Sequence, residues 1–172
     1  ALLFVSCGDS KPQDPYHISV KLNPYGISPL SAQVKIKSNK HFKGTLKILG
    51  ESPIEQPFEM TMDSLFVPVL GLYPNEVNKV LITMRNETET IVDTLTIKTQ
   101  GLPNQFPRIE INKLDRDGME PGWHGCDIHF ANFGKFNSMP LIFDDQGIVR
   151  WYLDLGFAGE MMSPFQRLKD GN

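Results

Sequence analysis

The stretch "GWHGCDIHF" contains the densest group of chemically reactive side chains in this sequence: His124, Cys126 and His129. Imidazole nitrogen and thiolate sulfur are ligands that zinc prefers, and a tetrahedral site would need all three residues to converge with a fourth ligand. In a β-strand, however, His124 and Cys126 share one face and His129 points to the other. The sequence therefore favours packing of Trp123 and Phe130 in a sheet with the histidines hydrogen-bonded nearby. We assign no metal ion.

The other two histidines lie in segments typical of a protein surface. His17 falls on the polar side of an alternating segment, and His41 falls in the turn-like stretch "SNKHFKG". We expect surface roles for both. No glycine-rich phosphate loop and no Ser-His-Asp ordering appears in the sequence, so no nucleophile can be assigned from motifs.

The first residues, "ALLFVSC", resemble the end of a bacterial lipoprotein signal peptide, in which a small residue precedes the cysteine to be acylated. We therefore expect residues 1–7 to end a signal with Cys7 as the lipidated residue, and the polar stretch 8–14 to act as a tether. The alternative is an apolar strand with an ordinary thiol. Acyl chains on Cys7 would anchor the protein to a membrane without a transmembrane helix, facing either the periplasm or the outer-membrane surface. Cys126 would then be the remaining thiol of this segment, which excludes a disulfide within it.

Composition narrows the class of protein. The 172 residues carry a formal net charge of −3 and no run of basic residues, so no nucleic-acid partner is expected. An apolar fraction of 40% and a charged fraction of 22% indicate a chain that is neither disordered nor membrane-spanning overall. Thirteen prolines and fourteen glycines, scattered between short apolar stretches, favour many turns over long helices.

Apolar residues alternate with polar ones from Tyr16 to Lys98, which is the pattern of strands with one buried face. The pattern indicates about seven short strands separated by turn-rich stretches, and so an immunoglobulin-like β-sandwich over residues 15–100. The Cys-Trp-Cys pattern of immunoglobulin domains is absent. The alternating apolar positions are Tyr16, Ile18, Val20 and Leu22; Leu30, Ala32, Val34 and Ile36; Leu46 and Ile48; Phe58, Met60 and Met62; Val80, Ile82 and Met84; and Ile91, Leu95 and Ile97.

Beyond residue 100 the amino-acid composition of the sequence changes. The stretch 101–107 contains two prolines and a glycine and is interpreted as a linker. Residues 108–172 are richer in Trp, Phe and Asp-Gly turns, and "MPLIFDDQGIVRWYLDL" indicates a strand, a turn and a second strand. This region is interpreted as the first, incomplete part of a β-propeller, so the expected fold class is all-β.

Three segments carry a resemblance to a known family. "LNPYGISPLSAQVKI", "VPVLGLYPNEVNKVLI" and "FDDQGIVRWYLDL" occur in the same order as in arylsulfotransferases, and the chain resembles that family from Tyr16 to Asn172. The resemblance implies an exported enzyme with an N-terminal β-sandwich and a six-bladed propeller.

The resemblance also implies an activity: transfer of a sulfuryl group from a phenolic sulfate donor to a phenol acceptor through a sulfo-histidine, without a cofactor. Imidazole is a good nucleophile, and arginine or further histidine residues would stabilise the sulfuryl oxygens. In the family these residues lie on later propeller blades. The catalytic residues are thus unknown and expected beyond Asn172, and the segment alone is expected to be inactive. The other hypothesis is a non-catalytic lipoprotein whose sandwich and propeller bind a ligand or partner.

Overall fold

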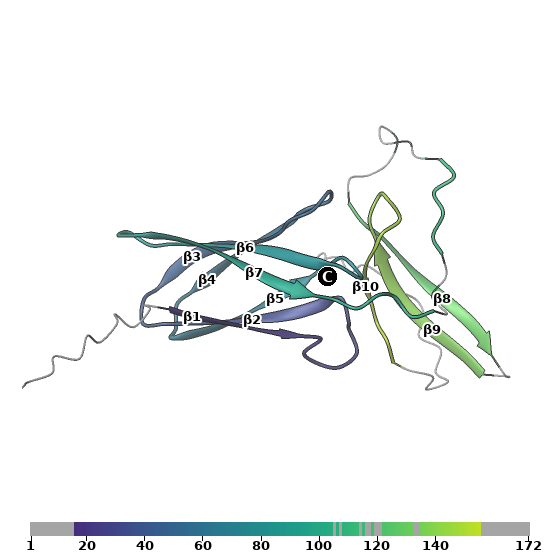
Figure 1. Cartoon of the computed structure of the whole chain (residues 1–172), viewed down its shortest axis with the longest axis horizontal. Helices are drawn as coiled ribbons and strands as arrows, with labels where there is room; N and C mark the ends of the chain where they lie inside the picture. Colours follow the sequence, from purple (N-terminus) through teal and green to yellow (C-terminus); the bar gives the residue numbers. More distant parts are fainter. Residues whose placement is uncertain are drawn as a thin grey trace, which may run out of the picture.

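The computed structural model describes residues 16–155, apart from 105, 107, 114, 116–117, 119–121 and 133–134. Within these residues the chain forms ten β-strands and no helix (Figure 1). Cys7 and the segments 1–7, 8–14 and 156–172 lie outside the described residues. The all-β class expected from the sequence is confirmed. In the described part of the chain, no helical segment has the length and apolar character required to traverse a bilayer.

Seven strands form a two-layer sandwich, which confirms the immunoglobulin-like prediction (Figure 1). All neighbouring strands within each layer are antiparallel, with continuous registers. One layer has the order β1-β2-β5, with β1 at Tyr16–Leu22, β2 at Ser31–Ser38 and β5 at Ser64–Leu70. The other has the order β4-β3-β6-β7, with β3 at Phe42–Ile48, β4 at Ile54–Met60, β6 at Val77–Arg85 and β7 at Thr90–Lys98.

The core lies between these layers and follows the alternation of the sequence. Strands β2, β3 and β6 contribute every second side chain, because successive residues of a strand point to opposite faces. Pro57 and Pro68 lie in β4 and β5, the outer strands of their layers, where a residue without an N–H is tolerated. The buried residues of this cluster are Ala32, Val34, Ile36, Phe42, Leu46, Ile48, Met60, Val67, Val69, Leu72, Val80, Ile82, Met84 and Ile97.

Three apolar residues of the expected pattern are exposed rather than buried. Val20 and Leu22 are 39% and 37% exposed, because β1 is the outermost strand of its layer and its second half is only partly covered. Met62 is 69% exposed, because β4 ends at Met60 and the chain turns there. Alternation therefore predicted the inner face of β1 for Val20 and Leu22 but not how far that face is covered, and it wrongly extended the strand to Met62.

A third sheet has the order β10-β9-β8, with β8 at His124–Asn132, β9 at Lys135–Phe143 and β10 at Val149–Tyr152. The strand, turn and strand expected from "MPLIFDDQGIVRWYLDL" are confirmed as β9, the turn 144–148 and β10. A second apolar cluster joins Leu141, Val149 and Tyr152 of this sheet to Leu30 of the sandwich. The propeller itself stays a prediction.

Residues 101–107, interpreted as a linker, contribute to the second cluster. Leu102 and Phe106 pack against it, and the rings of Phe106 and Tyr152 meet edge to face with centroids 5.3 Å apart. The division of the chain into domains at this stretch stays a prediction.

Candidate functional site

The three segments that carry the family resemblance come together at one end of the sandwich, beside the β8–β10 sheet (Figure 1). They are the loop 23–30 after β1, the loop 71–76 after β5, and the turn and strand 144–152. They are far apart in sequence. The side chain of Arg150 contacts the loop 71–76, and the loop 23–30 accepts backbone hydrogen bonds from Leu72 and Asp154. We call Arg150, Asp144, Ser52, Gly71, Tyr73 and Trp123 the Arg150 cluster.

Arg150 is fully buried, with 0% of its surface exposed. Its Nε and Nη2 donate to the carbonyl oxygen of Gly71 at 3.0 and 2.8 Å, and its Nη1 donates to the carbonyl oxygen of Ser52 at 3.0 Å. Nη1 also donates to Oδ2 of Asp144 at 2.9 Å, which is an ion pair between two buried groups. A guanidinium offers five N–H donors in a fixed plane, which suits several acceptors at once.

A β-bulge directs Arg150 into this position. Val149 pairs with Phe143, whereas Trp151 pairs with Ile142, so one residue of β10 has no partner in β9. That residue is Arg150. A bulge re-aims the extra side chain, and here it allows the consecutive residues Val149 and Arg150 both to be buried.

Asp144 connects the turn to the cation. Its Oδ1 accepts hydrogen bonds from the backbone N–H groups of Gln146 at 3.1 Å and Ile148 at 3.0 Å, while its Oδ2 accepts from Arg150. Gly147 has a φ of +76°, a conformation that suits glycine, and its N–H donates to the Asp144 carbonyl at 2.9 Å. The same carboxylate therefore shapes the turn and neutralises the buried cation.

Two aromatic rings lie over the guanidinium. The ring of Tyr73 is 3.6 Å from the guanidinium carbon and that of Trp123 is 4.9 Å away, measured to the ring centroids. Tyr73 is held in turn, because its hydroxyl accepts the N–H of Ser52 at 2.9 Å and its own N–H donates to Asn78 Oδ1 at 2.8 Å. Arginine stacks well on aromatic faces, so both rings stabilise the buried charge.

Gly71 is required by this packing. Its φ is +88°, and a Cβ atom at this position would collide with Ile54 Cδ1 and Trp123 Cη2. Trp123 was expected to pack within the hairpin region; it also contacts the sandwich here. The side chain of Phe130, expected beside it, lies outside the described residues.

The loop 23–30 completes the junction. Asn23 adopts a left-handed conformation with φ of 46°, and its Oδ1 accepts the N–H of Ser28 at 2.9 Å. This fold places Leu30 in the second apolar cluster and leaves the carbonyl of Ile27 to accept the N–H of Asp154 at 2.8 Å. Sandwich and hairpin are thus joined by apolar packing, by backbone hydrogen bonds and by Arg150.

The Arg150 cluster is a structural contact between two parts of the chain rather than a catalytic site. Arg150 and Asp144 are 0% and 1% exposed, and protein acceptors occupy the guanidinium. A substrate could not reach a cation in this state. The cluster therefore fixes the sandwich to the segment that follows it.

The histidines and cysteine of "GWHGCDIHF" lie on β8 as the alternation predicts. His124 pairs with Phe143 and stacks on that ring at 5.5 Å, and its Nε2 is buried with no hydrogen-bond partner among the described residues. Burial raises the pKa of the half-buried Cys126 thiol, and the charge of Asp127 adds to the rise. His129 is exposed. Within the residues that the structure describes, no three potential metal ligands gather in one place.

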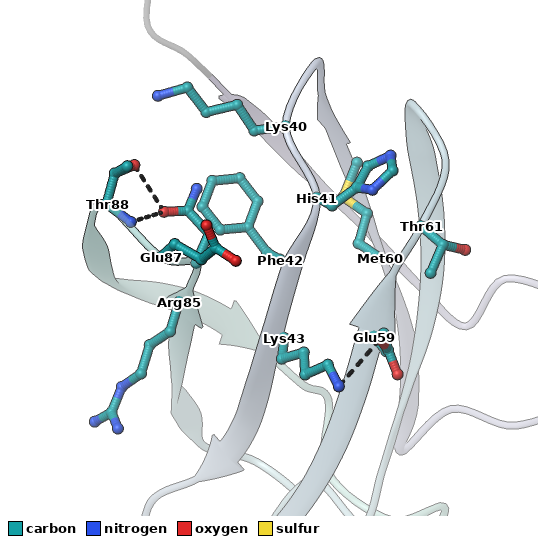
Figure 2. Close-up of a pocket in the computed structure, with 11 residues that line it drawn as sticks. Lys40, His41, Phe42, Lys43, Glu59, Met60, Thr61, Arg85, Glu87 and Thr88 are labelled. Carbon is teal, nitrogen blue, oxygen red and sulfur yellow. Dashed lines mark hydrogen bonds and ion pairs between the residues drawn. The ribbon is translucent and has the colours of Figure 1, made fainter.

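His17 and His41 are both exposed, which agrees with the expected surface positions. His41 lies at the rim of an open groove of about 800 Å³, at the turns that join β2 to β3, β4 to β5 and β6 to β7 (Figure 2). Phe42 and Met60 line its floor but are only 2% and 1% exposed, so little apolar surface is available there.

Charges around the groove are largely paired. Lys43 lies 3.3 Å from Glu59 and Lys40 lies 2.6 Å from Glu89. A dashed line in Figure 2 marks the first of these ion pairs. Lys40 accounts for most of the lowering of the Glu89 pKa. Two lysines at the groove are therefore engaged by glutamates.

Sequence reasoning missed Asp144 and Arg150. The element "DDQGIVRW" was interpreted as a turn and a strand only, although it places an acid and a base six residues apart across a hairpin. The sequence showed only an arginine between Val149 and Trp151. Regular alternation would place such an arginine on the exposed face of the strand, which is common for arginine. Only the bulge makes that position buried.

Comparison with known proteins gives a match for the sandwich. Residues 19–100 match the family described as the arylsulfotransferase Ig-like domain. Over 178 aligned residues the chain is 29% identical to the arylsulfate sulfotransferase AssT of Escherichia coli O6:H1 and 24% identical to that of Lelliottia amnigena. Each alignment covers 79% of this chain and 30% of the relative, so the chain spans about a third of the length of these enzymes. The sandwich of this chain is therefore similar to the arylsulfotransferase Ig-like domain.

Proposed function

We propose that this chain is the N-terminal part of an exported arylsulfotransferase. The complete protein would transfer a sulfuryl group from a phenolic sulfate ester to a phenol. The observation that carries the proposal is the match of residues 19–100 to the arylsulfotransferase Ig-like domain, together with similarity to arylsulfate sulfotransferases across 79% of the chain.

The proposed chemistry has two steps and needs no cofactor. A neutral histidine nitrogen attacks the sulfur of the donor, an N–S bond forms as the S–O bond breaks, and the phenolate leaves. The acceptor phenol then attacks the same sulfur, loses its proton to a base, and the N–S bond breaks. Cationic groups around the sulfuryl oxygens lower the barrier of both steps.

The catalytic residues of this proposal lie beyond Asn172. Within the described residues, the buried cation at Arg150 is enclosed by protein acceptors, and His124 and His129 stand on opposite faces of β8. The described part of this chain contributes the sandwich and its junction, which would hold the following propeller in place.

Assay of the complete protein tests this proposal. With p-nitrophenyl sulfate as donor and a phenol as acceptor, the complete protein should release p-nitrophenol and form the new sulfate ester, while Ala1–Asn172 should show neither product. His124→Ala and His129→Ala in the complete protein should reduce kcat modestly at most. His17→Ala, at an exposed site on β1, is the matched control.

Two results would contradict the proposal. Recovery of a sulfuryl label on His124 or His129, with total loss of activity in the folded variant, would move the nucleophile into this segment. Absence of transfer with every phenolic sulfate tested would favour the non-catalytic binding protein instead.

We also propose that Cys7 is acylated and anchors the protein to the cell envelope. The small residue Ser6 before Cys7 and the polar stretch after it support this proposal. Full-length Cys7→Ser protein should then move from the detergent phase to the aqueous phase on phase partitioning, whereas Cys126→Ser should not. Mass spectrometry that finds an unmodified Cys7 in the mature wild-type protein would disprove the anchor.

A further inference from the structure

The outer face of the β1-β2-β5 layer carries a cluster of lysines. In the strand register, Lys37 lies between His17 and Ser64, and Lys35 lies between Ser19 and Phe66. Lys21 pairs with Gln33 in the next row of the same face. Lys21 and Lys37 are exposed and Lys35 is half-buried. We call this surface, with its three lysines, the basic face.

No acidic residue lies in these three strands, whose sequences are YHISVKL, SAQVKIKS and SLFVPVL. The nearest carboxylate in sequence is Asp63, in the turn before β5. The lysines of the other layer are arranged differently, because Lys43 and Lys47 each lie 3.3 Å from a glutamate of the adjacent strand. The basic face thus keeps its positive charge although the whole chain has a net charge of −3.

Large apolar side chains accompany the lysines on this face. Phe66 is 53% exposed and Leu70 is 48% exposed. The Lys35 ammonium lies 4.9 Å from the centre of the Phe66 ring, so charge and apolar surface are directly adjacent. Exposed aromatic and aliphatic groups beside cations are typical of surfaces that bind at the interface of a bilayer.

The position of the face in the chain indicates the partner. Strand β1 begins at Tyr16, nine residues after Cys7. Nine residues reach at most about 30 Å when fully extended. If Cys7 is acylated, as proposed above, the layer that contains β1 is held within this distance of the membrane surface.

We propose that the basic face docks on an anionic membrane surface, with the lysines near lipid phosphates and with Phe66 and Leu70 at the headgroup boundary. The proposal rests on the acylated Cys7 for its location, but the recognition itself comes from the face. Each lysine near an anionic surface raises the partition coefficient about fivefold. Docking would orient the sandwich, and hence the segment that follows it, relative to the membrane.

Vesicle flotation of the full-length Cys7→Ser protein tests this face without any acyl chain. Vesicles of phosphatidylcholine with 30 mol% phosphatidylglycerol, at millimolar lipid and low ionic strength, are compared with vesicles of phosphatidylcholine alone. The protein should float with the anionic vesicles and stay unbound with the neutral ones, and added salt should release it.

A charge-matched pair of variants locates the binding. Lys21→Gln, Lys35→Gln and Lys37→Gln together should lower the partition coefficient about 100-fold, since each removes about a factor of five. Lys43→Gln, Lys47→Gln and Lys79→Gln together remove the same charge from the outer face of the other layer and should lower it less than tenfold. Thermal unfolding confirms that both triple variants are folded.

Three outcomes overturn the proposal: no binding of the Cys7→Ser protein to anionic vesicles, equal binding to neutral vesicles, or equal losses in the two triple variants. An unmodified Cys7 in the mature protein would disprove the anchor. It would not change the binding of the Cys7→Ser protein to vesicles, because that experiment uses no acyl chain. Loss of sulfuryl transfer in the complete protein would likewise not affect it. Failure of the face is therefore distinguishable from failure of the proposed function.

Discussion

A single buried guanidinium joins two parts of this chain. Arg150 has acceptors from the sandwich, Gly71 and Ser52, and one from its own hairpin, Asp144. A buried ion pair stabilises only when its charged groups make further hydrogen bonds, and here the guanidinium makes four hydrogen bonds to protein acceptors. Removal of one partner would leave the other as a buried charge without a counter-ion, which lowers the free energy of unfolding.

Arg150→Met in Ala1–Asn172 should therefore lower the free energy of unfolding by about 3 to 5 kcal/mol, because Asp144 keeps a buried charge without its partner. The double variant Asp144→Asn with Arg150→Met should recover part of this loss. Arg85→Met, at an exposed position on β6, should change stability by less than about 0.5 kcal/mol. Denaturant unfolding measures all three. A stability of Arg150→Met equal to wild type would disprove the role given to the pair.

Tyr152 makes the junction sensitive to alkaline pH. Burial, with a smaller effect of Asp154, raises the pKa of Tyr152 to about 12 from an ordinary value of 10. A raised pKa means that folding favours the neutral phenol, so this stabilisation is complete below pH 10 and is lost between pH 10 and about 12.

Tyr152→Phe should abolish this part of the pH dependence. The variant should lose less stability than wild type between pH 10 and 12, by an amount on the order of 2 kcal/mol. Tyr25→Phe, at a position 76% exposed, is the control and should follow wild type. Unfolding curves measured at fixed pH values across this range give the comparison. Parallel curves for Tyr152→Phe and wild type would contradict the assignment.

Elements were easier to predict from the sequence than the junction between them. Alternation gave the faces of β2, β3 and β6, because the opposite layer covers one face of each of these inner strands and every second residue there must be apolar. It was less informative for β1 and for Met62, where cover depends on the opposite layer and on where the strand ends. It could not reveal Arg150, since a β-bulge breaks the period that sequence reasoning uses.

Limited proteolysis separates the elements by stability. The core cluster of the sandwich draws only on residues between Ala32 and Ile97, whereas the second cluster has four buried residues. Ala1–Asn172 should therefore be cut first between Gly101 and Pro107, leaving a lasting fragment of about residues 16–100. Arg150→Met should accelerate this first cut. Mass spectrometry identifies the fragments, and a lasting C-terminal fragment with a digested sandwich would contradict this assignment.

At the scale of the whole molecule, the sandwich is asymmetric in charge. One layer pairs two of its outer lysines, Lys43 and Lys47, with glutamates of the adjacent strand, and the other layer carries the basic face. A net charge of −3 gave no indication of this division, because the sum over a chain does not report how charges are distributed between faces. The family resemblance predicted the fold. It did not predict the basic face, on which the proposed orientation at the membrane depends.

The contacts of Arg150 also set an order of events when the protein is made. The carbonyl groups of Gly71 and Ser52 receive their donor from a residue 79 and 98 positions further along the chain. Ribosomes add roughly 5 to 20 residues per second, so these groups wait several seconds for their partner. All seven sandwich strands are synthesised before Arg150, so the contacts of Arg150 at this end form only after the strands exist. Closure of that end is therefore a late step of maturation, triggered when the hairpin arrives.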